Sequence, residues 1–270
     1  MAGALAGGSS PFRDGILEGK VAFVAGGTSG INLGIARRFA ELGARVAVVG
    51  RNPEKAAAAA ASIGEDALDF SADVRDFGAI RGVMEHVHAR LGPLDIVVSG
   101  AAGNFLAPAL GMSANAFKTV IDIDLNGTFN VFRGCHDLLA ENASLIAITA
   151  GQAVNAMQLQ AHACAAKAGI NQLVRVLALE WGPHVRVNGI SPGPIADTEG
   201  MRRLAPDAAT KQSHFERIAM KRWGEIGEVA ECAVFLCSDA ARYVTGTILD
   251  CDGGSGVGDA TQRSVERGLA

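Results

Sequence analysis

Short apolar runs alternate with longer stretches of helical periodicity along most of the chain. The apolar runs are VAFVAG, RVAVVG, ALDFSAD, LDIVVSG, SLIAITA, VRVNGISPG and TILDCDGG. Most are apolar at successive positions, which is typical of parallel strands that helices cover on both faces. The pattern therefore predicts an α/β fold: one doubly wound Rossmann domain with a parallel sheet of about seven strands.

The stretches between these runs predict the helices and one insertion. Helices are expected near 30–42, from Pro53, near 76–90, over roughly 113–140 and around Lys167. Residues 197–222 have little strand character, and Pro206 interrupts their helical pattern. Because this segment follows a strand end, we expect a small lid above the carboxyl edge of the sheet, where ligands bind in such folds.

Composition limits the class of protein. The 270 residues are 49% hydrophobic, enough for one large domain, which we place at 18–256 between flexible tails at 1–17 and 257–270. A net charge of −4 and an aromatic content of 5% do not favour nucleic-acid binding. The histidines show no ligand spacing, so no metal site is expected.

The cysteines and the chain ends point to a location. The five cysteines form no CxxC pair, which favours reduced thiols over disulfides or a zinc ribbon. The start MAGALAGGSS lacks the pattern of a secretory signal, and no apolar run is long enough to span a membrane. The C-terminus does not end in an SKL-like peroxisomal address. These features predict a cytoplasmic protein with no membrane partner.

A glycine-rich turn follows the first strand. In AGGTSGINLGIA, residues 25–36, the glycines allow a tight turn and close approach of a pyrophosphate to backbone amides. The residues expected to hold the dinucleotide here are Gly26, Thr28, Ser29, Gly30 and Ile31.

The end of the second strand bears on which dinucleotide binds. Gly50 stands where an acid would accept from a free ribose 2′-hydroxyl, and Arg51 follows as a bidentate partner for a 2′-phosphate. This favours NADP(H), the alternative being a solvated arginine at a strand end.

Several motifs together resemble the short-chain dehydrogenase/reductase family. They are GGTSGI, Asp73 after the third strand, SGAAGNF, the helix with Lys167 and VRVNGISPGPI, and the resemblance spans Gly19 to Gly254. It implies a homotetramer, with the helices near 113–140 and 160–181 at the interface. The implied cofactor contacts are Asp73 and Val74 for the adenine, Gly100, Ala101 and Ala102 for the ribose side, and Pro192, Gly193 and Ile195 for the nicotinamide.

The sequence departs from this family at the catalytic centre. The family's tyrosine would fall at Ala163 and its serine at Ala150, which leaves Lys167 as the matching member. The sole tyrosine, Tyr243, lies close to the last strand. Smaller departures are Asn32 at the third glycine of the turn, and Ser99, Gly100 and Ala101 in place of the NNAG pattern.

The missing tyrosine discriminates between reactions. Ketone reduction leaves a localised alkoxide, and loss of its general acid typically costs about 10²- to 10⁴-fold in rate. Hydride addition to a conjugated thioester instead spreads the charge into an enolate, which hydrogen-bond donors can stabilise until a carbon is protonated. Ala163 and Ala150 therefore favour a conjugated thioester over a carbonyl substrate.

Longer strings are similar to a subgroup, the peroxisomal type of 2,4-dienoyl-CoA reductase: AAGNFLAPA, DIDLNGTFNVFR, HACAAKAGI, EWGP and SPGPIADTEGMRRL. This resemblance implies NADPH-dependent reduction of a 2,4-dienoyl-CoA to a 3-enoyl-CoA, with protonation through an aspartate-held water. It assigns catalysis to Asp124 and Asp252, and we assign Lys167 to the cofactor ribose and to positive potential over the nicotinamide.

Alternatives stay open for several of these residues. Asp122 and Asp124 are two apart on a helix, so at most one faces the site, and motif position selects Asp124. Burial would favour its protonated form, whereas a nearby lysine would favour the carboxylate. Asp252 also suits a plain turn after a strand. His162 could donate to the substrate or simply pack inside a helix.

The acyl-CoA side of the site is also indicated. Asn104 and Phe105 follow the SGAAG turn and are expected to line the acyl site. The lid is locally basic, which suits coenzyme A phosphates but also a solvated helix; its cations are Arg202, Arg203, Lys211, Arg217, Lys221 and Arg222. Two other functions remain: reduction of a simple 2-enoyl thioester, and a non-catalytic NADP-binding sensor or scaffold.

Overall fold

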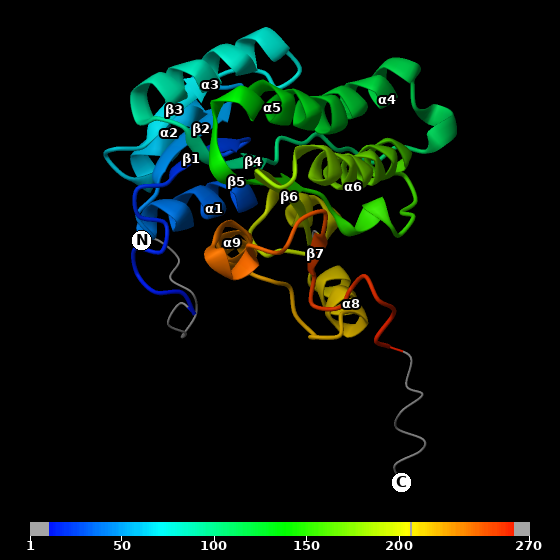
Figure 1. Cartoon of the computed structure of the whole chain (residues 1–270). Helices are drawn as coiled ribbons and strands as arrows, with labels where there is room; N and C mark the ends of the chain where they lie inside the picture. Colours follow the sequence, from blue (N-terminus) through cyan, green and yellow to red (C-terminus); the bar gives the residue numbers. More distant parts are fainter. Residues whose placement is uncertain (1–10, 206, 262–270) are drawn as a thin grey trace.

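A computed structural model describes residues 11–205 and 207–261 of the chain (Figure 1). They contain a seven-stranded sheet in the order β3-β2-β1-β4-β5-β6-β7, and every neighbouring pair is parallel. The strands are β1 (Val21–Ala25), β2 (Arg45–Gly50), β3 (Leu68–Ser71), β4 (Leu94–Ser99), β5 (Leu139–Ile148), β6 (Val185–Pro192) and β7 (Ile248–Cys251). The expected doubly wound parallel sheet is confirmed.

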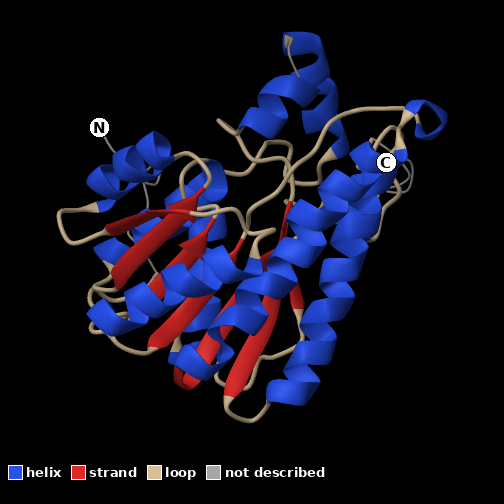
Figure 2. Cartoon of the chain, turned by 90° about the horizontal axis from the view of Figure 1, so that it is seen from above, coloured by secondary structure: helices blue, strands red, loops and turns tan. Residues whose placement is uncertain are grey.

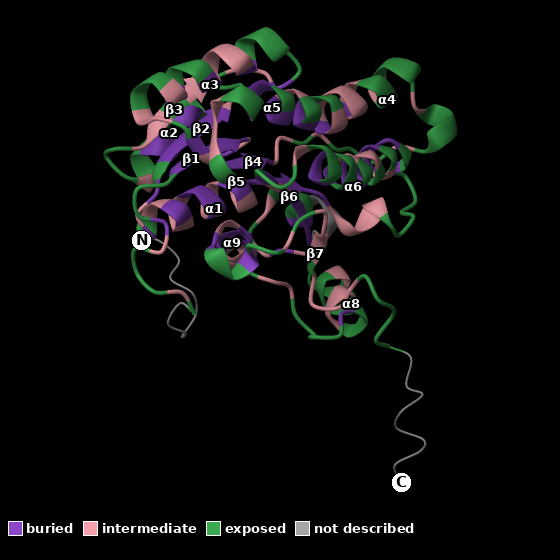
Figure 3. Cartoon of the chain, viewed as in Figure 1, coloured by how far each residue is buried: buried purple, intermediate pink, exposed green. Residues whose placement is uncertain are grey.

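Helices cover both faces of the sheet (Figures 1 and 2). They are α1 (Gly30–Glu41), α2 (Pro53–Ile63), α3 (Phe77–Leu91), α4 (Ala114–Ile121), α5 (Gly127–Cys135), α6 (Ala161–Trp181), α7 (Glu199–Leu204), α8 (Ala208–Arg217) and α9 (Ile226–Cys237). One core lies between the sheet and α1, α2 and α9, and a second between the sheet and α3, α5 and α6. Figure 3 shows the buried residues concentrated along the central strands, with exposed residues on the outer sides of the helices.

Local sequence explains where these elements begin. All five residues of β1 are buried, as its continuous apolar run predicts. Asn52 and Asp76 precede α2 and α3, and each side chain accepts a hydrogen bond from a backbone amide of the first turn. These caps satisfy amides that have no partner within the helix.

The expected single helix over 113–140 is wrong in one respect. The structure divides it into α4, a π-helical turn at Asp122–Asn126, and α5, which ends at Cys135. A π-helical turn contains one residue more than an α-helical turn, and such turns are frequent at functional sites. Strand β5 then begins at Leu139, earlier than the SLIAITA run, because Leu139 pairs with Leu94 before an irregularity in the register.

The segment expected to form a lid connects β6 to α9. It contains the two short helices α7 and α8, and Ile195 pairs with Gly224 where the chain leaves and rejoins the domain. Pro206, which predicts the interruption between them, lies outside the described residues. We keep the name lid for residues 197–222.

Both expected tails are shorter than the sequence suggests. Leu17 is 1% exposed in the core beside α1, and its amide donates to the Leu42 carbonyl at 3.0 Å. At the other end, the Arg217 guanidinium of α8 contacts Asp259 at 3.1 Å. Leu17 therefore packs into the domain and Asp259 contacts the lid although residues 257–261 are exposed, while residues 1–10 and 262–270 lie outside the described part.

The packing of Leu17 is testable by truncation. We expect Leu17→Ala to lower the free energy of unfolding by about 2–5 kcal/mol, because it leaves a cavity in the core. Leu110→Ala is the matched control, since Leu110 is fully exposed and should change stability by less than about 0.5 kcal/mol. Urea unfolding measures both, and equal effects would contradict a folded segment at 12–17.

Candidate active site

A buried ion pair joins the π-helical turn to α6. Asp124 is 1% exposed, and its Oδ2 lies 3.3 Å from Lys167 Nζ. Lys167 Nζ also donates to the carbonyl of Ile148 at 3.1 Å, and Asp124 Oδ1 accepts from the Gly103 amide at 2.8 Å. The pair therefore connects the segment after β4 and the last residue of β5 to the π-helical turn and α6. Charges buried in this way are stable only with such partners.

The π-helical turn separates its two aspartates as their spacing predicts. Asp122 points outward and forms an ion pair with Lys118, one helical turn earlier. Asp124 points inward, and its carbonyl accepts from the buried hydroxyl of Thr128 at 2.7 Å. Thr128 Oγ1 in turn accepts from Ser99 at 3.1 Å. These hydroxyls satisfy polar groups that would otherwise be buried without a partner.

The two positions where the family has hydroxyl groups hold none. Ala163 is 2% exposed on the first turns of α6, and Ala150 follows directly after β5 and Thr149. The buried pair thus lies next to a surface of methyl groups and backbone, without a phenol or alcohol at either position.

His162 is buried beside the vacant tyrosine position. Its ring is 0% exposed and lies 4.3 Å, centroid to centroid, from the ring of Phe105. Neither ring nitrogen makes a hydrogen bond of ordinary geometry. Burial lowers the pKa of the imidazole, and the Asp124 charge and the nearby Phe105 carbonyl oppose this only in part. The neutral imidazole is therefore the form favoured at neutral pH.

Two glutamines, Gln152 and Gln160, border the site, and the sequence analysis does not predict either of them. Gln160 is 5% exposed, and its Oε1 accepts from Asn104 Nδ2 at 2.7 Å and from Gln152 Nε2 at 3.2 Å. The available signal was spacing, since Gln160 precedes Ala163 by three residues and so shares its helical side. Asn104 is thereby held against the start of α6.

A cavity of about 560 Å³ opens at the carboxyl edge of the sheet, between the sheet and the lid. Its walls come from the segments after β5, β6 and β7, from the lid, and from residues 258–259; they include Gln152, Gln160, Pro192, Gly193, His214, Arg217 and Asp252. Asp124 and Lys167 are not among the lining residues. The expected site residues thus separate into a buried pair and a group at the wall of the cavity.

Asp252 has a clear structural role in its turn. Its carboxylate accepts from the amides of Gly254 at 2.8 Å and Gly256 at 2.7 Å. A Cβ at Gly193 would lie 2.6 Å from the Asp252 Cα, so the turn packs directly on the Pro192–Gly193 backbone. Asp252 therefore stabilises the turn after β7, as the structural alternative predicts, and it also lies at the cavity wall.

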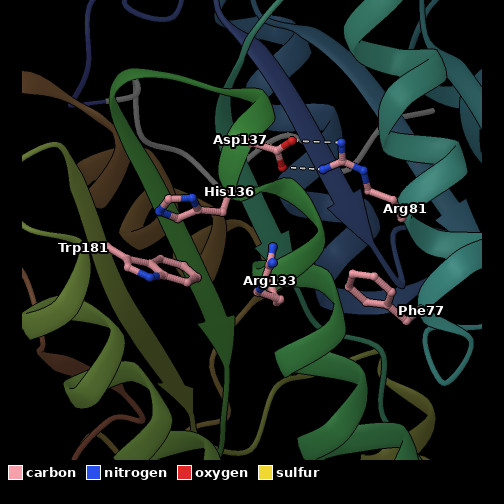
Figure 4. Close-up of a pocket in the computed structure, with 6 residues that line it drawn as sticks. All are labelled: Phe77, Arg81, Arg133, His136, Asp137 and Trp181. Atoms are coloured by element: carbon pink, nitrogen blue, oxygen red, sulfur yellow. Dashed lines mark hydrogen bonds and ion pairs between the residues drawn. The ribbon is translucent and has the colours of Figure 1, made fainter.

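A second hollow lies on the outer surface, beside α3, α5 and α6 (Figure 4). Its volume is about 540 Å³, and it is lined by Phe77, Arg81, Arg133, His136, Asp137 and Trp181. Arg81 and Asp137 form a bidentate ion pair at its rim, with 3.0 Å between Nη2 and Oδ2. It shares no lining residue with the cavity under the lid.

The glycine turn after β1 has the geometry of a pyrophosphate site. Gly26 has φ of +76°, and a Cβ there would lie 2.7 Å from the Ala101 amide. Helix α1 begins at Gly30 with no acidic residue in its first turn, and Ser29 makes no side-chain cap. Its first amides are therefore available to an anion. The residues present fit a dinucleotide.

The end of β2 fits a phosphorylated ribose. A Cβ at Gly50 would lie 2.6 Å from Thr28 Cγ2, so an acidic side chain has no room there. The exposed Arg51 guanidinium makes no ion pair with another described residue. Asp73 pairs instead with Arg75 at 2.6 Å, and this guanidinium lowers the pKa of the Asp73 carboxyl.

The remaining residues expected to bind the cofactor lie in different surroundings. Val74 is 6% exposed and packs at Gly127, and Ile195 is 2% exposed below the lid. Ile31 packs against the core beside α1. Ala102 is exposed in the segment after β4.

The sequence profile of a family described as "Enoyl-(Acyl carrier protein) reductase" matches residues 25–256. The chain belongs to the short-chain dehydrogenase/reductase family. A Bacillus anthracis short chain dehydrogenase of known structure is 36% identical, with a TM-score of 0.79 over 88% of this chain and 97% of that one. A structure from Sinorhizobium meliloti 1021 is 31% identical, with a TM-score of 0.84 over 90% of this chain and 99% of that one.

Curated members of the family resemble the chain over most of its length. Peroxisomal 2,4-dienoyl-CoA reductase [(3E)-enoyl-CoA-producing] of Rattus norvegicus is 40% identical over 90% of this chain and 86% of its own. The Arabidopsis thaliana protein of the same name is 39% identical over 91% of this chain and 87% of its own. A Bacillus subtilis protein named "Probable 2,4-dienoyl-CoA reductase [(2E)-enoyl-CoA-producing]" is 35% identical over 88% and 97%.

Two further properties of this short-chain dehydrogenase/reductase concern membranes and metals. Among the described residues, no helix combines the length and apolar character needed to cross a membrane. Within residues 11–205 and 207–261, no three or more histidine, cysteine, aspartate or glutamate side chains are grouped to hold a metal ion.

The environment of His162 predicts a pH effect on stability. Because its pKa is lowered in the folded protein, the unfolded chain takes up a proton at higher pH, and stability falls as pH drops below the ordinary histidine pKa. We expect an NMR titration of His162 below that value. His162→Leu should lose less stability between pH 7.5 and 5.5 than the native protein; an equal loss would contradict a buried neutral imidazole.

Proposed function

We propose that the protein reduces a conjugated acyl thioester with NADPH, and that the substrate is a 2,4-dienoyl-CoA. The observation that carries this proposal is a buried Asp124–Lys167 pair beside two alanines, Ala150 and Ala163, at positions where a carbonyl reductase needs hydroxyl groups. The names of the rat, Arabidopsis and Bacillus subtilis relatives support the substrate class.

The electronic structure of the substrate explains why no phenol is needed. A bound NADPH supplies a hydride, which we expect at the δ-carbon of the diene. The displaced electron pair spreads along the conjugated chain to the α-carbon and the thioester oxygen, where hydrogen-bond donors can stabilise it. A proton at the α-carbon gives the 3-enoyl product, and a proton at the γ-carbon gives the 2-enoyl product. The position of the proton donor therefore sets the product.

Asp124 and Lys167 have complementary roles in this proposal. The Lys167 ammonium, 3.3 Å from the Asp124 carboxylate, keeps positive potential next to the site while negative charge develops on the substrate, and we also assign it to the ribose hydroxyls of the cofactor. Asp124 holds a water through which the α-carbon is protonated. Because Asp124 is 1% exposed and outside the cavity lining, such a water is needed to connect it to the substrate.

His162, Asn104 and Phe105 are assigned to the thioester and acyl side. A neutral imidazole keeps one N–H, and no described residue accepts it in ordinary hydrogen-bond geometry, so it can donate to the thioester oxygen once Phe105 moves aside. Asn104 is already held by Gln160 at 2.7 Å. Asp252 fixes the turn at the cavity wall, and we assign it to the reacting end of the substrate.

The cofactor assignment rests on Arg51 and Gly50. The Arg51 guanidinium is exposed and has no ion-pair partner among the described residues, and it follows a position where a Cβ would meet Thr28, so a 2′-phosphate is favoured over a free 2′-hydroxyl. The glycine turn and the start of α1 hold the pyrophosphate, and Asp73 with Val74 borders the adenine. Arg217 at the cavity wall and the other lid cations suit the phosphates of coenzyme A.

A homotetramer through α4, α5 and α6 belongs to the same proposal. Each of these helices exposes a large apolar side chain: Phe117 at 38%, Phe129 at 45% and Leu179 at 85%. Exposed apolar residues on adjacent helices are typical of a surface that another subunit covers. A cytoplasmic location also stays a prediction, since the rat and Arabidopsis relatives are peroxisomal by name.

The central test compares substrates and a matched pair of variants. We expect NADPH oxidation with a 2,4-dienoyl-CoA, little with a 2-enoyl-CoA, and none with simple ketones. Asp124→Asn should lower kcat by about 10²- to 10⁴-fold by removing the proton route. Absorbance at 340 nm measures the rate, and NMR of the product in D₂O locates the incorporated deuterium.

Asp122→Asn is the control for this test. It removes a carboxylate two residues away that pairs with Lys118 on the outside, so activity should change by less than about twofold. Preference for 2-enoyl-CoA would favour the simple enoyl reductase. Tight NADPH binding without turnover of any thioester would favour the sensor, and robust ketone reduction would contradict the proposal.

Arg51 decides the cofactor preference. We expect Arg51→Ala to weaken NADPH binding by about 10- to 100-fold and leave NADH binding unchanged, because a charge-assisted contact to the 2′-phosphate is lost. Arg45→Ala, at the opposite end of β2, should change neither. Fluorescence titration gives both dissociation constants, and parallel loss for both nucleotides would refute the role of Arg51.

A further inference from the structure

Asn32 connects the two loops that form the dinucleotide site. It lies in the first turn of α1, is 8% exposed, and its Nδ2 donates to the carbonyl of Gly100 at 2.8 Å and to that of Gly26 at 3.4 Å. Gly26 belongs to the turn after β1, and Gly100 to the turn after β4. One amide group therefore links the turn after β1 to the turn after β4, and Asn32 itself is 68 residues away from Gly100 in the chain.

The requirement for glycine at position 100 comes from Asn32 and not from the backbone. Gly100 is not among the glycines with positive φ, so an ordinary residue could adopt its conformation. A Cβ there would nevertheless lie 2.3 Å from Asn32 Oδ1 and 2.4 Å from Nδ2. Because the amide is anchored by hydrogen bonds, it could make room only by giving them up.

The chemistry of the partners fixes the identity of residue 32. Both neighbours are carbonyl oxygens, so the side chain must donate, and an amide can do so where a carboxylate cannot. The other amide atom, Oδ1, is buried without a partner among the described residues. It is therefore a spare acceptor at the edge of the dinucleotide site.

These two positions are also where the sequence departs from the family pattern in this region. Asn32 replaces a glycine, and Gly100 replaces a larger residue, and the structure places them in contact. We propose that Asn32 and Gly100 form a size-complementary pair that sets the spacing of the two loops for NADPH, with Asn32 as the positioning residue. This inference rests on the dinucleotide-binding part of the proposed function.

A double-mutant cycle tests the pair. We expect Gly100→Ala and Asn32→Gly each to weaken NADPH binding by about 5- to 30-fold, because one forces the amide out and the other removes it. The double variant Asn32→Gly with Gly100→Ala should bind NADPH within about threefold of the native protein, since residues in contact are not additive. Fluorescence titration gives the dissociation constants, and thermal unfolding without nucleotide gives the stability of each variant.

Two further variants separate positioning from general packing. Asn32→Asp keeps the volume but cannot donate, so it should weaken NADPH binding, and Gly100→Ala should not rescue it. Gly82→Ala in α3 is the control for adding a methyl group to a glycine, because a Cβ there meets nothing within 4 Å. It should leave NADPH affinity unchanged.

The outcomes are distinct. Native-like NADPH affinity in Gly100→Ala, or additive losses in the double variant, would overturn the pair. If Gly100→Ala does not fold, recovery of folding by Asn32→Gly supports the pair and absence of recovery contradicts it. If the native protein binds no NADPH, the proposed function fails instead, and the same cycle read by thermal unfolding still decides whether the two residues are coupled.

Discussion

The site depends on the buried ion pair between Asp124 and Lys167. An ammonium group this deep among alanines is stable only next to a carboxylate and a carbonyl oxygen, and both are supplied within 3.3 Å. Each partner needs its own support, because Asp124 reaches inward only through the π-helical turn and is held by the Gly103 amide. The pair therefore fixes the positions of the segments after β4 and β5 as well as those of two helices.

In the proposed function, the same pair forms the polar centre of a family member in which Ala163 and Ala150 stand at the positions expected for the tyrosine and serine. A hydroxyl group serves a substrate whose charge stays on one oxygen, whereas a conjugated thioester distributes that charge over several atoms. What such a substrate requires is positive potential and a route for one proton. We propose that Lys167 and Asp124 provide these without touching the carbonyl oxygen directly, which agrees with their absence from the lining of the cavity.

The two halves of the site are held by different forces. The proposed dinucleotide half is formed where glycines leave room for a neighbouring group, at Gly26 for the Ala101 backbone and at Gly100 for the Asn32 side-chain amide. The acyl half is formed by side chains and by the lid, whose helix α8 contacts Asp259 from beyond the last strand.

The sequence by itself determined the parallel sheet, the alternation of strands and helices along the chain and the glycine turn, because apolar periodicity and residue spacing are local properties. The choice of Asp124 over Asp122 came from its position in a family motif. It did not reveal the π-helical turn, the packing of Leu17, the amide cluster around Gln160 or the contact between Asn32 and Gly100. Those depend on which distant segments meet. The neighbours of a residue across the fold decide whether a buried nitrogen of His162 lacks a partner, or whether a glycine has room for a methyl group. Only the tertiary structure brings these neighbours together.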